Sequence, residues 1–312
     1  MNYWQKEGRA RHLLYAGRLT AARRAFERCR DQAAGEDQRE RVWYCEIQLA
    51  TIQLLGGETE RSRRRLQEAL LAAPTFYCKS LSAFQLACLY RQRRELDRAR
   101  EYANRALHFS AQVPEPGRAA RLRTIIFNHQ GNCALDVAHY EDALGAFSRA
   151  LEAFRAWPGA LGAETNRTLA SLYDNIGYTL ICLGSPGPAV ELLELALEHA
   201  AACEHGGLVM EARKDLALAY LELQEHDRAA EQARRGLQAV AGTPVADREA
   251  WMSEPAERLL MILGQVACVR GEEDQARQIL ARLTGDHPAG QATEPFMFFS
   301  QAGVKHGLYQ WK

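Results

Sequence analysis

The sequence predicts an all-α protein built from repeated helix–turn–helix units. Three observations lead to this fold class. The composition is rich in Ala, Leu, Arg and Glu, which favour helices. No run of Val and Ile alternates with polar residues in the way that indicates a sheet. Finally, one pattern of small and aromatic residues recurs along most of the 312 residues.

The pattern is most complete between Thr124 and Trp157. Glycine and alanine let two antiparallel helices approach closely, and aromatic side chains fill the space beside them. This stretch therefore predicts a tightly packed helix pair. Its small and aromatic positions are Gly131, Ala134, Tyr140, Ala143, Phe147 and Ala150.

With this spacing the stretch resembles a tetratricopeptide repeat, a helix–turn–helix unit of about 34 residues. The resemblance implies a right-handed superhelical solenoid, in which each repeat buries its apolar face only against its neighbours. It covers residues 1–287 as about seven repeats, so we expect fourteen helices. The predicted repeats begin near residues 3, 43, 80, 124, 170, 210 and 257.

Turn residues and small residues support each of the other six repeats in chain order. None of the ten prolines falls in the middle of a predicted helix, which supports the predicted positions independently of the small-residue pattern. The supporting residues are Gly17, Ala22 and Phe26 in the first repeat; Gly56, Gly57 and Ala69 in the second; Ala87, Tyr90 and Ala103 in the third; Gly177, Gly184 and Ala196 in the fifth; Ala217, Tyr220 and Ala233 in the sixth; and Gly264, Gly271 and Ala276 in the seventh.

All intervals between predicted beginnings exceed the usual length of about 34 residues. In this respect the chain resembles the long-repeat type found in kinesin light chains and in bacterial peptide-sensing regulators. Such regulators carry a helix-turn-helix DNA-binding domain before their repeats. This sequence leaves no room for one before residue 3, so we do not expect direct nucleic-acid binding.

The repeat pattern ends at Pro288, and residues 288–312 form an aromatic tail. A solenoid needs its last repeat covered, so the tail is expected to cap the seventh repeat. Alternatively it docks into the groove of this chain or of a second copy, because so much apolar surface rarely stays in water. Its large apolar residues are Phe296, Met297, Phe298, Phe299, Leu308, Tyr309 and Trp311.

Charge is balanced overall but not along the chain. The 39 basic and 39 acidic residues cancel, so net charge gives no argument for nucleic acid. Residues 1–130 carry 24 Lys and Arg against 14 Asp and Glu, and residues 131–312 carry 15 against 25. This asymmetry is either ordinary surface variation or the mark of a partner, including a second copy in a homodimer, with the opposite polarity.

The eight cysteines are scattered and form no CxxC pair, which fits free thiols in a reducing compartment. No apolar signal region and no stretch of membrane-spanning length is present in the sequence. We therefore expect a cytoplasmic protein without membrane contact.

The resemblance implies that the first helix of each repeat lines the concave surface. Asparagine side chains there can both donate to and accept from a peptide backbone. Aromatic and arginine side chains supply anchors of the kind that dominate binding energy. The candidate ligand-binding residues are Tyr44, Phe84, Arg91, Asn128, Asn132, Asn175, Tyr178 and Lys214.

Other chemistry has little support. The carboxylate clamp of chaperone-binding repeats is not matched, because Glu211 and Asp215 stand where they would repel a carboxylate. We interpret these acids, and Asp174, as solvated helix faces. His129 and Cys133 lie one helical turn apart, but such a pair is expected by chance. No nucleotide-binding or hydrolase motif occurs, so neither an enzyme nor a cofactor is expected.

The sequence thus favours a scaffold or adaptor that binds a protein or peptide along its concave groove. One alternative is a peptide-sensing regulatory protein that acts on a separate output partner. A second is a structural protein that assembles with itself through its aromatic tail or its oppositely charged halves.

Overall fold

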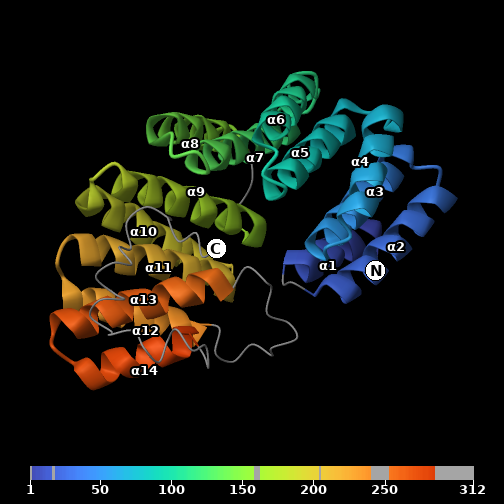
Figure 1. Ribbon diagram of the computed structural model, residues 1–312. Helices are drawn as coiled ribbons and strands as arrows, with labels where there is room; N and C mark the ends of the chain where they lie inside the picture. Colours follow the sequence, from blue (N-terminus) through green and yellow to red (C-terminus); the bar gives the residue numbers. More distant parts are fainter. Residues whose placement is uncertain (1, 16–17, 158–161, 204, 240–252, 285–312) are drawn as a thin grey trace. The chain divides into compact units, whose positions relative to one another are not determined.

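The computed structural model describes residues 2–15, 18–157, 162–203, 205–239 and 253–284. These residues form fourteen helices and no strand, which confirms the predicted all-α fold class (Figure 1). Within the same residues, no helix combines the length and apolar character needed to cross a membrane. The aromatic tail predicted at residues 288–312 lies outside the described part of the chain.

The helices fall into two compact units, Met1–Gly159 and Ala160–Lys312. The N-terminal unit contains α1 (Tyr3–Tyr15), α2 (Leu19–Gly35), α3 (Arg39–Leu55), α4 (Thr59–Ala72), α5 (Phe76–Gln92), α6 (Leu96–Ser110), α7 (Pro116–Leu135) and α8 (Tyr140–Arg155). The C-terminal unit contains α9 (Ala163–Cys182), α10 (Pro186–Ala202), α11 (Gly206–Glu222), α12 (His226–Ala239), α13 (Ser253–Val269) and α14 (Glu273–Thr284).

The first helix of the first repeat begins at Tyr3, as predicted, whereas the first helices of the later repeats begin earlier than the sequence pattern indicated. The helix predicted from residue 124 begins at Pro116, and the one predicted from residue 170 begins at Ala163. The small-residue pattern marks where two helices approach closely, and this approach starts only after the first turns. The first turns themselves are set by other signals, such as the proline at the start of α7.

Close packing within a pair depends on residues without a side chain. A Cβ atom added to Gly131 of α7 would overlap the ring of Phe147 in α8. A Cβ at Gly177 of α9 would lie 2.6 Å from Cγ of Leu193 in α10. Glycine is therefore required at both places, which confirms the predicted close approach of these helices.

The first helices of neighbouring repeats also contact one another. Helix α5 contacts both α3 and α7 in the N-terminal unit, and α11 contacts both α9 and α13 in the C-terminal unit. We call the side of each unit formed by these first helices its inner face. The predicted binding residues all belong to these helices.

The turns inside the repeats share one backbone conformation. Gly57, Gly184 and Gly271 have φ of 80°, 77° and 71°. At the corresponding places in three other repeats the chain carries side chains in the same left-handed region, at Arg94, Ala138 and Gln224.

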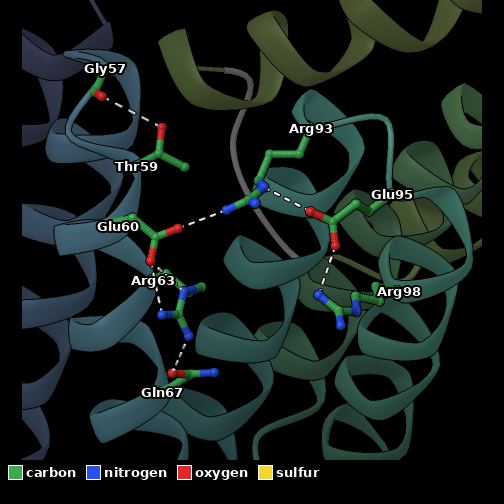
Figure 2. A network of polar contacts seen from close by, with 8 residues as sticks. All are labelled: Gly57, Thr59, Glu60, Arg63, Gln67, Arg93, Glu95 and Arg98. Atoms are coloured by element: carbon green, nitrogen blue, oxygen red, sulfur yellow. Dashed lines mark hydrogen bonds and ion pairs between the residues drawn. The ribbon is translucent and has the colours of Figure 1, made fainter.

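Away from the inner face, ion pairs join successive repeats (Figure 2). The carboxylate of Glu60 on α4 binds Arg63 at 2.8 Å and Arg93, after α5, at 2.7 Å. Arg93 also contacts Glu95 at 2.7 Å, and Glu95 contacts Arg98 at 2.7 Å. These pairs link α4 to the turn between α5 and α6, but they are exposed, so each adds little to stability.

Candidate functional site

The eight predicted binding residues divide between the two units. Tyr44 of α3, Phe84 and Arg91 of α5, and Asn128 and Asn132 of α7 belong to the N-terminal unit. Asn175 and Tyr178 of α9 and Lys214 of α11 belong to the C-terminal unit.

A buried histidine occupies the middle of the N-terminal set. The ring of His129 meets that of Phe84 edge to face, with centroids 5.8 Å apart. Its Nδ1 lies 3.7 Å from Sγ of Cys88, and its Nε2 lies 3.5 Å from Sγ of Cys133. Burial, with a smaller effect from Arg91, lowers the pKa of His129 to about 4. The ring is therefore neutral at pH 7. Among the described residues, no group of three or more potential ligands could hold a metal ion.

Arg91 is held in place by an acid at the end of α7. Its Nε lies 2.7 Å from Oδ2 of Asp136 and its Nη2 lies 3.1 Å from Oδ1, a bidentate arrangement. Burial lowers the pKa of Arg91, but the hydrogen bond to Asp136, the charge of Asp136 and the nearby Cys133 and Cys88 together raise it by more, so the guanidinium stays charged. This ion pair joins α5 to the end of α7. It also fixes the position of the Arg91 side chain, which the sequence analysis predicted to contact a ligand.

Phe84, Asn128 and Asn132 are half-buried, whereas Tyr44 is only 8% exposed. Burial, followed by the neighbouring Tyr77, raises the pKa of Tyr44 well above its ordinary value. Tyr44 therefore packs beneath the inner face and offers little surface to a ligand.

The inner face of the N-terminal unit also contains arginines that the sequence analysis missed. Nη1 of Arg118 lies 2.6 Å from Oε1 of Glu40, and its guanidinium lies 4.4 Å from the ring centroid of Tyr77. Nη1 of Arg121 donates a hydrogen bond of 3.0 Å to the hydroxyl of Tyr77. Both arginines precede residue 124, where the fourth repeat was expected to begin, so they were left out of the predicted groove.

A second acid lies close to these arginines. Glu7 of α1 is buried, and burial raises the pKa of its carboxyl. Arg11, which lies 3.6 Å from it, and more distant arginines including Arg118 and Arg121 act in the opposite direction. Arginines of α1, α3 and α7 thus act together on this buried carboxyl.

In the C-terminal unit, Lys214 is held between two acids. Its Nζ lies 2.7 Å from Oε2 of Glu211 and 3.3 Å from Oδ1 of Asp215. It also lies 5.9 Å from the ring centroid of Tyr178. Burial lowers the pKa of Lys214, but the attraction of Asp215 and Glu211 together outweighs burial, so the pKa is raised.

The sequence analysis interpreted the acids around Lys214 as a solvated helix face, and this interpretation is wrong. Asp215 is only 2% exposed, because α11 is packed between α9 and α13. Oδ1 of Asp174 is buried and accepts no hydrogen bond from any described residue. Burial raises the pKa of Asp174 well above its ordinary value, and the charge of Asp215 raises it further.

Helix α13 contributes Arg258 to this cluster. Its Nη2 lies 2.5 Å from Oε1 of Glu254. Burial lowers the pKa of Arg258, but Glu254, Tyr178 and Asp215 together raise it by more. The sequence analysis missed Arg258. The seventh repeat was expected to begin at residue 257, and its pattern of small residues carries no signal for an arginine at position 258.

No protein-family model and no curated protein matches this chain. Solved structures do match. A Rap protein complexed with Competence and Sporulation Factor has a TM-score of 0.63 and 13% identity, covering 95% of this chain and 79% of its own. PilF from Pseudomonas aeruginosa has a TM-score of 0.57 and 18% identity, covering 86% of this chain and 99% of its own.

A third similar structure is a Signal Transduction ATPase with Numerous Domains from Pyrococcus horikoshii, described as having a tetratricopeptide repeat sensor. Its TM-score is 0.63 with 17% identity, and the match covers 89% of this chain and 40% of that protein. At such identities the likeness concerns the fold. The recurring sequence pattern and these likenesses together show that the chain has the all-α fold of the tetratricopeptide-repeat proteins.

Proposed function

We propose that the protein is a scaffold whose inner faces bind an extended or helical segment of a protein or peptide. The observation that carries this proposal is the half-buried row of Phe84, Asn128 and Asn132 on α5 and α7, two helices that contact each other. Half-buried polar and aromatic side chains on adjoining helices offer anchors that a partner can cover.

The chemistry of this row suits a peptide backbone. Asparagine amides can donate to a carbonyl and accept from an amide proton whatever the sequence of the segment. Phe84 offers apolar surface beside them, and its ring contacts the neutral, buried His129. Aromatic anchors would then supply most of the affinity, with the amides setting the register.

Support also comes from the similar Rap structure, which was determined in complex with Competence and Sporulation Factor. Competence and Sporulation Factor is a ligand of that Rap protein. For this chain the likeness supports only the use of a similar helical scaffold for binding.

The experiment compares capture of partners from a lysate of the source organism by the intact chain and by a triple variant, Asn128→Ala, Asn132→Ala and Asn175→Ala. A matched control carries Gln67→Ala, Asn104→Ala and Gln232→Ala, all on second helices. We expect the intact chain and the control to retain a partner that the inner-face variant loses, with all three proteins equally helical by circular dichroism. Equal retention by all three would overturn the assignment of the inner face.

A further inference from the structure

We propose that the inner face of the C-terminal unit contains a subsite for a cationic group, such as an arginine or lysine side chain of the bound segment. Asp174 and Asp215 would be its anionic partners and Tyr178 its aromatic wall. This inference rests on the proposed binding function and names the chemistry that one part of the groove selects.

The cluster holds more carboxylates than cations. Two cations, Lys214 and Arg258, are close to four acids, Asp174, Glu211, Asp215 and Glu254. Lys214 pairs with Glu211 and Asp215, and Arg258 pairs with Glu254. Asp174 has no ion pair within hydrogen-bonding distance among the described residues, although Lys214 and Asp215 act on it electrostatically.

The unmatched oxygen of Asp174 points to a missing partner. Oδ1 of Asp174 is buried and accepts no hydrogen bond from a described residue. Oδ1 of Asp215, by contrast, lies 3.3 Å from Nζ of Lys214, which is its ion-pair partner. A buried carboxylate without partners is costly, and such groups in folded proteins are nearly always satisfied. Without a ligand, a proton can meet this demand at Asp174, and a ligand cation would take the place of that proton.

The surroundings favour a cation over a neutral donor. Asp174 and Tyr178 lie one helical turn apart on α9, so a guanidinium bound by the carboxylate can lie against the phenol ring. Residues 160–312 carry 13 Lys and Arg against 21 Asp and Glu, whereas residues 1–159 carry 26 against 18. The field of the C-terminal unit therefore attracts cations.

The test uses a pool of randomised hexapeptides passed over immobilised full-length protein at pH 7.5, with the retained peptides sequenced by mass spectrometry. Three proteins are compared: the intact chain, Asp174→Asn, and Glu191→Gln as a control at an exposed acid of α10. We expect peptides retained by the intact chain and by the control to be enriched about tenfold in Arg or Lys at one position, the factor of a charge-assisted hydrogen bond. For Asp174→Asn, this enrichment should vanish.

A second measurement uses one retained peptide and its copy with citrulline, a neutral isostere, in place of the selected arginine. The intact chain should bind the citrulline copy about tenfold more weakly, and Asp174→Asn should bind both alike. Retained peptides without cationic enrichment, or enrichment that persists in Asp174→Asn, would overturn the subsite alone. Failure of the intact chain to retain any peptide would overturn the proposed binding function and the subsite with it.

Discussion

At Gly131 a single missing methyl group decides how closely α7 and α8 pack. We predict that Gly131→Ala lowers the free energy of unfolding by about 1–3 kcal/mol, because the added Cβ overlaps the ring of Phe147 in a filled core. Gly145→Ala on α8 is the matched control, since nothing lies within 4 Å of its added Cβ. That change should be neutral or stabilising by up to about 1 kcal/mol. Urea unfolding of both variants measures the difference, and equal stabilities would contradict the packing argument.

His129 makes the stability of the N-terminal unit depend on pH. Its pKa is about 4 in the folded chain against an ordinary value of 6.5, so between these values the unfolded chain binds more protons. Stability therefore falls as the pH is lowered through this window, by about 2 kcal/mol between pH 7 and pH 5.

Replacing the imidazole removes this dependence. We predict a smaller loss between pH 7 and pH 5 for His129→Gln in urea unfolding, whereas the exposed His108→Gln should keep the full loss. The charged groups near His129 are Arg91 and Asp136, and both variants retain them. An unchanged pH dependence in His129→Gln would show that another group is responsible.

At the scale of helices and turns, the left-handed residues between paired helices offer a test of backbone strain. Arg94 and Gln224 have φ of 61°, a conformation that costs L-residues about 1–2 kcal/mol. We predict that Arg94→Gly and Gln224→Gly each raise the unfolding free energy by about 0.5–1 kcal/mol, after the entropic cost of glycine. The control Arg100→Gly, in the middle of α6, should lower it by about 1 kcal/mol. Thermal unfolding would refute the argument if all three changes were destabilising.

Two kinds of ion pair join neighbouring repeats, and they should contribute differently to the free energy of unfolding. Arg91 is bidentate to Asp136 in a half-buried setting, so Arg91→Gln leaves a carboxylate with poor compensation. We predict a loss of about 1–2 kcal/mol for this variant. Arg93→Gln breaks the exposed pairs of Figure 2 and should cost less. The ranking can be measured at low and high salt, and a greater loss for Arg93→Gln would contradict it.

At the scale of the whole molecule, the two units should respond differently to mild acid. The N-terminal unit loses stability as the pH falls, because the lowered pKa of His129 disfavours protonation in the folded chain. The raised pKa of Glu7 favours protonation in the folded chain and offsets part of this loss. In the C-terminal unit, Asp174 and Asp215 have raised pKa values, mainly through burial. Their folded forms bind protons more readily than the unfolded chain does, so they add stability at low pH and lose this contribution as the pH rises through their folded pKa.

This contrast can be measured on the full-length chain by hydrogen exchange with mass spectrometry. On lowering the pH from 7 to 5, after correction for intrinsic exchange, we predict that α5 and α7 lose more protection than α9 and α11. Asp174→Asn should reduce the advantage of the C-terminal unit. Equal losses in both units would contradict the opposed pKa shifts.

The sequence by itself determined the all-α repeat fold and the close helix contact at Gly131, because both depend on residue patterns within about 34 positions. Only the tertiary structure decided which inner-face side chains are already engaged. It placed Lys214 between two acids, buried Tyr44, and left Asp174 without a hydrogen bond at Oδ1 from the described residues. The ion pairs of Lys214 lie within α11, but the burial of these groups and the coupling of Asp174 to Asp215 arise between helices some 40 residues apart. Distance and solvent exclusion set their energies, and a pattern within one repeat encodes neither.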